Sequence, residues 1–298
     1  MTYHELLEAF LQASESKASY PVYKRLVDQH LKQWVDYPVF SQISDWHLSL
    51  EKKPHHANKG LNFLKAMFTW ALRRGLFTGQ NPATGVKRHS TVSRERVMTS
   101  QEVKLLLGCL DMVQHEKLVV LLLVLLTTGC RLSEATHMKR EHLNINTGAW
   151  WQPTTKNGRP HTTYIPLQVR QEIAKLPSKG EYIFAGAYEH CWSRAGVEKT
   201  WRQVRSALGL QDVRLHDFRR TLASHLYRHT KDEYLVKRCI NHVNKSVTAI
   251  YVRISAEEVA AALQAQADRF FALNAAPAPV RTWSRRESDR GIEGGLNA

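Results

Sequence analysis

A wholly apolar stretch near the middle of the chain limits the fold more than any other feature of this sequence. All nine residues from Leu118 to Leu126 are Leu or Val, so a helix over about 117–128 is apolar almost all round. Crossing a bilayer takes roughly 20 apolar residues, so we expect this helix to be the buried core of a folded body rather than a membrane span. The N-terminus MTYHELLEAFLQ has acidic residues and lacks the apolar stretch of a secretory signal, which predicts a cytoplasmic protein.

The charge balance indicates the kind of partner. The 298 residues include 42 Lys and Arg against 27 Asp and Glu, a net charge of +15, which favours a polyanion. The length predicts two domains, and a hydrophobic share of 43% is typical of globular proteins. The four cysteines lie far apart without a Cys-x-x-Cys pair, so we expect reduced core residues rather than disulfides or a zinc ribbon.

The chain divides by pattern into a helical region, a basic connection, a mixed body and a tail. Apolar residues recur at spacings of three and four from Tyr3 to about Phe77, which predicts four helices, the last over about 57–76. The segment KRHSTVSRER suits an exposed linker, and the Ala-, Pro- and Gly-rich C-terminal segment predicts a flexible tail. The predicted domains are a helical domain at 1–86, a basic linker at 87–97, a second domain at 98–275 and the tail at 276–298.

The segment after the apolar helix carries a candidate anion site. Gly129 can end that helix, and Ser133 can begin the next one with Glu134 in its first turn. Arg131 is then placed at a junction where the free amides of a helix N-terminus gather, which suits a phosphate. An arginine that caps the carbonyls of the preceding helix is the structural alternative.

A β-hairpin is predicted in the body. Strand signals at Ala149–Gln152 and Thr162–Ile165 flank Asn157-Gly158, the dipeptide that most favours a tight turn. Lys156 is therefore predicted beside the turn.

Capping boxes and helical periodicity predict the remaining elements. Thr99 with Glu102, and Ser255 with Glu258, mark two helix starts. Helical patterns also occupy about 168–176, 190–207, 216–228, 232–240 and 246–253, so the body is predicted to be mostly helical with a small sheet.

Two further constellations could carry chemistry. His216 and Arg219 are three residues apart at a helix start and share one face, so they could grip one anion, although a surface His and Arg are ordinary in a basic protein. Tyr251 follows His242 by nine residues, and most such tyrosines are packing residues. His225 and His229 are four apart on one helix, but with no third ligand apparent we expect no metal site.

Taken together and in this order, these segments resemble the tyrosine recombinase family, the site-specific recombinases of the phage integrase type. TTGCRLSE is similar to the first arginine box, TKNGRPHTTYIPL to the lysine hairpin, LHDFRRTLASHL to the His-x-x-Arg box, and INHVNKSVTAIYVR to the closing segment with the tyrosine. The N-terminal stretch ANKGLNFLKAMFTWALRRGLFTGQNPATGVK resembles the end of the family's helical core-binding domain.

The resemblance implies a set of catalytic residues and a mechanism. Tyr251 would be the nucleophile that forms a 3'-phosphotyrosine, and Glu134 would support the first arginine. The implied catalytic residues are Arg131, Lys156, His216, Arg219, His242 and Tyr251. Two arginines would hold the reacting phosphate in place of a metal, so no cofactor and no metal are expected.

The resemblance also implies a fold and partners. The fold would be mainly α, with a SAM-like core-binding domain and an α+β catalytic domain with a small antiparallel sheet, closing as a C-shaped clamp on duplex DNA. The expected DNA-binding residues are Lys59, Lys65, Arg73, Arg74, Lys87 and Arg88. The expected DNA partners are specific inverted-repeat sites. The chain would be a monomer when free and a homotetramer on synapsed DNA. An accessory bending or directionality factor is also expected, and the location would be the nucleoid in the cytoplasm.

Two residues depart from the family pattern, and one helix has two interpretations. Asn241 stands where the family usually has Gly, and Phe218 where Leu is common. Asn tolerates the left-handed conformation, so we expect the helix end before His242 to form. The apolar side of the C-terminal helix, with Val259 and Phe270, would dock on a neighbouring subunit or pack on its own domain.

The function that the resemblance implies is integration and excision of a prophage or another mobile element. A resolvase of chromosome or plasmid dimers is the alternative within the family. A type IB topoisomerase would share the phosphotyrosine chemistry, and a noncatalytic DNA-binding regulator would keep only the clamp.

Overall fold

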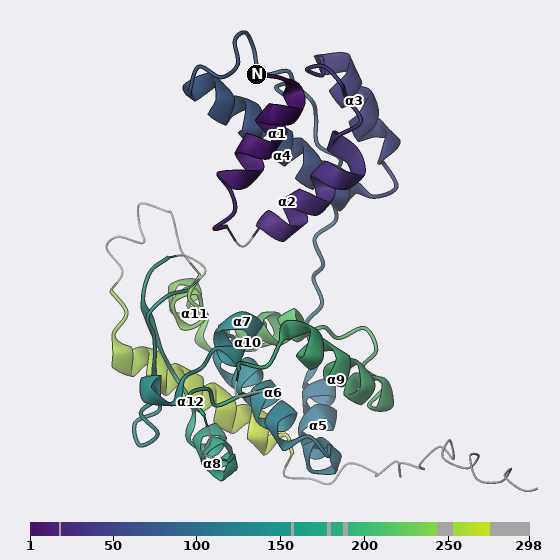
Figure 1. Cartoon of the computed structure of the whole chain (residues 1–298). Helices are drawn as coiled ribbons and strands as arrows, with labels where there is room; N and C mark the ends of the chain where they lie inside the picture. Colours follow the sequence, from purple (N-terminus) through teal and green to yellow (C-terminus); the bar gives the residue numbers. More distant parts are fainter. Residues whose placement is uncertain (18, 156–157, 178–179, 187–189, 243–252, 275–298) are drawn as a thin grey trace, which may run out of the picture. The chain divides into compact units, whose positions relative to one another are not determined.

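The chain forms two compact units, Met1–Arg94 and Glu95–Ala298 (Figure 1). The computed structural model describes all residues except 18, 156–157, 178–179, 187–189, 243–252 and 275–298. The predicted tail at 276–298, the predicted helix at about 246–253 and the Asn157 turn position therefore lie outside the described residues.

The first unit contains the four predicted helices. They are α1 (Tyr3–Gln12), α2 (Tyr20–Leu26), α3 (Phe40–Ser49) and α4 (Pro54–Arg73), with a π-helical turn, η1 (Val27–Leu31), after α2. Helix α4 begins three residues before the predicted Ala57, because a proline in the first turn gives up only an amide that has no helical partner. It ends before the predicted Leu76, since Gly75 takes a left-handed conformation with φ 67°.

The start of the basic segment is attached to this first unit. The Asn58 side chain donates to the His89 carbonyl at 2.9 Å, and the His89 ring stacks on His47 with 4.0 Å between ring centres. Lys65 donates to the carbonyl of Val86 at 3.0 Å. Residues up to His89 are thus held by α3 and α4.

The second unit is mostly helical. Its helices are α5 (Ser100–Gly108), α6 (Glu116–Thr128), α7 (Leu132–Thr136), α8 (Leu167–Lys175), α9 (Arg194–Ala207), α10 (Leu215–Thr230), α11 (Glu233–Cys239) and α12 (Ala256–Ala272), with 3-10 turns η2 (Leu110–Met112) and η3 (Arg140–His142). Strands β1 (Ala149–Gln152) and β2 (His161–Tyr164) form a two-stranded antiparallel sheet in which Gln152 pairs with His161. The predicted fold class, mainly α with a small antiparallel sheet, is confirmed.

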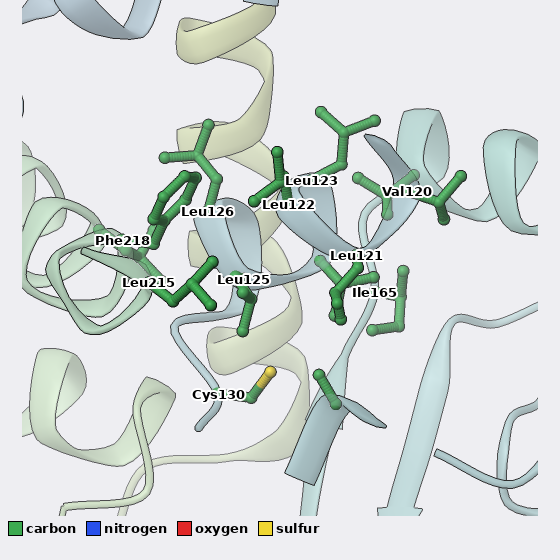
Figure 2. Close-up of a cluster of buried hydrophobic side chains, with 14 of the residues drawn as sticks. Val120, Leu121, Leu122, Leu123, Leu125, Leu126, Cys130, Ile165, Leu215 and Phe218 are labelled. Atoms are coloured by element: carbon green, nitrogen blue, oxygen red, sulfur yellow. The ribbon is translucent and has the colours of Figure 1, made fainter. Parts of the chain in front are cut away.

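Helix α6 is the core of the second unit, as its apolar sequence predicts. Leu118 and every residue from Val120 to Thr128 are buried. Figure 2 shows Leu126 of this helix beside Phe218 of α10, and Cys130 just beyond the helix end. The two predicted capping boxes form: Thr99 with Glu102 at α5, and Ser255 with Glu258 at α12. The core therefore extends directly to the end of α6, where the candidate site begins.

The apolar side of α12 packs within its own unit. Val259, Leu263 and Phe270 are fully buried, and the helix contacts α5, α6, α10, α11 and β2. Packing on its own domain, one of the two interpretations, is what the structure shows for this face.

Among the described residues, no helix is long and apolar enough to cross a bilayer.

The four cysteines are free thiols, as expected. Cys130 and Cys239 are buried core residues, and burial raises the pKa of each thiol to about 12. Cys109 and Cys191 are only half-buried, so the expectation of core residues holds for two of the four.

Candidate active site

The first candidate arginine lies at the junction between α6 and α7. Gly129 ends α6 in the left-handed conformation, with φ 62° and ψ 17°, as predicted. Arg131 occupies the N-cap of α7. Glu134 binds this residue twice: one carboxylate oxygen accepts from the Arg131 amide at 2.8 Å and the other from its guanidinium at 2.7 Å. The Arg131 side chain keeps 18% of its surface exposed, so it is oriented but still accessible.

The predicted start of α7 at Ser133 is wrong. The helix begins at Leu132, and Ser133 is an exposed residue of its first turn. The cap comes from the carboxylate of Glu134, three residues into the helix, which satisfies the amide of Arg131. This arrangement makes Glu134 both the cap and the partner of the arginine.

The second candidate arginine reaches the same junction from α10. Arg219 is 7% exposed, and its guanidinium donates to the carbonyl of Gly129 at 2.8 Å. Burial, reinforced by the nearby charge of Arg131, lowers the pKa of Arg219 to about 10, which leaves it cationic at neutral pH. Two cations therefore meet where α6 ends, one buried and one partly open.

His216 lies in the first turn of α10, the helix that also carries Arg219. Its side chain is exposed overall, yet partial loss of hydration and the charges of Arg220 and Arg219 lower its pKa below the usual value. The neighbouring Phe218 is fully buried and packs edge-on against Trp201 at 5.4 Å. The departure at Phe218 is thus a change in the core, while His216 faces outward.

Asn241 adopts the left-handed conformation. Its φ is 51°, and the amide of His242 donates back to the carbonyl of Lys237 at 2.9 Å, which closes α11. His242 is exposed immediately after this turn. The expectation that Asn can end this helix is confirmed.

The two remaining catalytic candidates, Lys156 and Tyr251, lie outside the described residues. Among the described neighbours of Lys156, the Gly158 amide donates to the Thr155 carbonyl at 2.8 Å. Among the candidates that the structure describes, it brings together Arg131, Arg219 and His216, since the charges of both arginines act on the histidine.

The structure adds one residue that the sequence reasoning missed. His161 begins β2 and is 6% exposed, and its Nδ1 accepts from the guanidinium of Arg238 on α11 at 3.0 Å. Burial and the positive charges of Arg238, Arg219 and Arg131 lower its pKa to about 4, against the opposite effect of Glu134. Alternate residues of a strand share a face, so the apolar Ile165 could have indicated that His161, four residues earlier, also points inward.

The DNA-binding candidates of the first unit differ in accessibility. Lys65 is half-buried, and its ammonium already binds the Val86 carbonyl. Arg74 lies over the ring of Trp70 at 5.0 Å, and Arg88 donates to Asn62. The exposed members of the set are Lys59, Arg73, Arg74, Lys87 and Arg88.

The two histidines of α10, His225 and His229, are not placed to bind one metal ion together. His225 is buried, and its Nε2 lies 3.1 Å from the carbonyl of Met98, whereas His229 is exposed. Within the described part of the chain, no three metal-binding side chains gather.

Comparison with known proteins gives three findings. Residues 96–258 match the model of the phage integrase family. The chain is 27% identical to the integrase of Escherichia phage P2 over 206 residues, 69% of this chain and 57% of that protein. It is 31% identical to the tyrosine recombinase XerS of Lactococcus lactis subsp. cremoris over 156 residues, 48% of this chain and 43% of that one.

A solved structure shares the fold. A lambda integrase tetramer bound to a Holliday junction is 17% identical, with a TM-score of 0.66, over 86% of this chain and 80% of that one. The chain spans about half the length of the curated relatives that it matches.

Proposed function

The chain belongs to the phage integrase family, and from this premise we propose that it is a site-specific tyrosine recombinase that cuts and rejoins duplex DNA. The observation that carries the proposal is the convergence of Arg131 and Arg219 on the end of α6. Two fixed cations at one point suit a phosphodiester, whose nonbridging oxygens gain charge when an oxygen nucleophile attacks. Because Arg219 is desolvated, its charge acts more strongly there than it would in water.

The proposed reaction conserves the energy of the bond that is cut. The Tyr251 oxygen attacks the phosphorus, a 3'-phosphotyrosine bond forms, and the bond to the 5' oxygen breaks. Lys156 supplies the proton that the leaving oxygen takes up, and His216 assists removal of the tyrosine proton. His242 holds the phosphate by a hydrogen bond, and Glu134 orients Arg131. Rejoining is the same reaction in reverse with a 5'-hydroxyl from another strand.

We further propose the partners and the domain limits that this activity requires. Strand exchange needs two duplexes, and the lambda neighbour is a tetramer on a Holliday junction, which supports a tetramer on DNA. A monomer when free is a further part of the proposal. The proposed limits are a core-binding domain at 1–86, a linker at 87–97 and a catalytic domain at 98–275. An accessory bending or directionality factor and association with the nucleoid belong to the same proposal.

The proposed biological role is integration and excision of a mobile element. The similarity to the phage P2 integrase over 69% of the chain supports this role. The similarity to the recombinase XerS is higher in identity but shorter, which keeps resolution of chromosome or plasmid dimers as the second candidate. The two roles share every catalytic residue and differ in the DNA site.

The test is capture of covalent adducts. Wild-type and Tyr251→Phe protein are expressed in cells that carry the DNA flanking the gene. The cells are lysed under denaturing conditions, and the DNA that stays covalently attached to protein is sequenced. We expect adducts at one short inverted repeat with the wild type and none with the Phe variant. Binding without adducts in both would contradict the proposal and favour a noncatalytic regulator, and relaxed supercoils without recombinant product would favour a topoisomerase.

A further inference from the structure

The imidazole of His161 is a buried polar group of the second unit that the proposed mechanism does not use. One ring nitrogen, Nδ1, accepts from the Arg238 guanidinium at 3.0 Å. Because an arginine can only donate, Nδ1 carries no hydrogen, and a neutral ring must carry its proton on Nε2. The Arg238 contact therefore fixes the tautomer of His161.

The protonated nitrogen of this ring is left without a partner. Nε2 is buried, and it makes no hydrogen bond with the residues that the structure describes. Leaving a buried donor unpaired costs about 1–3 kcal/mol, so such groups are rare in folded proteins and call for a specific explanation. A ligand that binds beside the ring is one such explanation.

The surroundings of the ring identify the chemistry of that ligand. The charges of Arg219 and Arg131, together with that of Arg238, all act on His161, with Glu134 as the opposing carboxylate. A cationic imidazole would be repelled here, whereas a neutral N–H beside two arginines suits an oxygen of an anion. The ring thus shares the environment of the two arginines.

We propose that His161 is a further hydrogen-bond donor of the active site, which holds a nonbridging oxygen of the reacting phosphodiester through Nε2 while Arg238 fixes its tautomer. The proposal rests on the proposed function. It adds a neutral donor to the two arginines, from a strand rather than from a helix junction.

A residue within the sheet offers a competing partner for Nε2. Gln152 pairs with His161 across the two strands, and its side-chain oxygen is also buried without a partner within the described part of the chain. A small rotation of either side chain could join the two groups. The variant Gln152→Met, which removes this acceptor at similar size, separates the two possibilities.

The first experiment reads the tautomer and the ligand directly, and it needs no DNA site. The full chain is labelled with 15N-histidine, and the His161 signals are assigned by their loss in His161→Gln. We expect the neutral Nε2–H form at pH 7, and we expect inorganic vanadate, a phosphate mimic, to shift this signal in both the wild type and Gln152→Met. A neutral Nδ1–H form, no response to vanadate, or a response that Gln152→Met abolishes would overturn the proposal.

The second experiment measures cleavage at the site that adduct capture identifies. We expect His161→Phe to slow single-turnover cleavage about 100-fold with less than threefold change in the Kd for DNA, and His161→Gln, which keeps an N–H donor, to retain more of the rate. His229→Phe, on the exposed side of α10, is the matched control. If the wild type cleaves and His161→Phe cleaves equally fast, the inference about His161 is overturned while the proposed function stands. If the wild type forms no adduct, the proposed function is contradicted, and the vanadate experiment alone tests whether His161 is a donor.

Discussion

Arg219 in the second unit and the exposed cations of α4 in the first unit are held in opposite ways. In the second unit, Arg219 is buried against the end of the apolar helix α6 and bound to the carbonyl of Gly129. In the first unit, Lys59 and Arg73 are exposed along α4. A buried, fixed cation can single out one phosphate, while exposed lysines and arginines attract the DNA backbone at large and are screened by salt. Under the proposed function, this difference predicts that the cleavage rate depends on Arg219 and the DNA affinity on the exposed cations of α4.

The largest expected effect on stability comes from Gly129→Ala, which disturbs the anchor of Arg219. Residue 129 has φ +62°, and an added Cβ would lie 2.9 Å from a methyl carbon of Leu222 and 3.0 Å from one of Ile240. Backbone strain and this overlap together should lower the free energy of unfolding by about 3 kcal/mol. Chemical denaturation of the full chain measures this loss in the free energy of unfolding.

Gly75→Ala is the matched control in the first unit. Gly75 has nearly the same φ, +67°, but nothing lies within 4 Å of an added Cβ. Only the backbone strain remains, so we expect a loss of about 1 kcal/mol. Equal losses in the two variants would show that the end of α6 is not tightly packed.

The second prediction concerns the pH dependence of stability. The folded pKa of His161 is lowered to about 4 from 6.5, so between these values the unfolded chain binds a proton that the folded chain does not. Stability from this group is therefore present above pH 6.5 and lost as the pH falls toward 4, by about 2 kcal/mol between pH 7.5 and pH 5. The free energy of unfolding, measured by denaturation at both pH values, should fall by this amount in the wild type and by less in His161→Gln. Equal losses in the two proteins would contradict the prediction.

The third prediction concerns the orientation of Arg131. Glu134→Gln keeps the shape but removes the charge that holds the guanidinium at 2.7 Å. We expect single-turnover cleavage to slow about tenfold, about 1.4 kcal/mol in the barrier, with DNA affinity unchanged. Glu257→Gln, on an exposed acid of α12, serves as the control and should cleave like the wild type. A change in Kd without a change in rate would show that Arg131 serves binding instead.

The smallest effect is expected on the surface of the first unit. Lys59→Gln should leave stability within about 0.5 kcal/mol of the wild type, weaken DNA binding a few-fold, and lower the slope of log K against log salt by about 0.9. Binding titrations at several salt concentrations measure the slope. An unchanged slope would remove Lys59 from the DNA-contacting surface.

Local patterns predicted the parts of the fold that depend on neighbouring residues. The apolar run predicted a buried α6, and Gly129 predicted its end. The family resemblance located the helix end before His242, and Asn241 tolerates the left-handed conformation found there. The strands of the hairpin were located within one residue. In each case a periodicity or a backbone preference of the residue itself determines the structure.

The features that the sequence did not predict depend on distant or competing partners. The ring of His161 is held by Arg238, which lies 77 residues away and donates to it, and no local pattern contains that contact. The start of α7 was misplaced because a serine is the usual cap, whereas here Glu134 satisfies the amide of Arg131. Lys65 is tied to Val86, so its charge alone overstated its availability.

The most direct test of the separation between catalysis and affinity compares Arg219→Gln with Arg73→Gln on one DNA site. Single-turnover cleavage at saturating protein and the Kd for the same DNA are measured for both variants. We predict that Arg219→Gln slows cleavage about 1000-fold, about 4 kcal/mol in the barrier, with Kd within tenfold. Arg73→Gln should weaken binding a few-fold and leave the saturated rate unchanged. Parallel losses of rate and affinity in both variants would contradict the account.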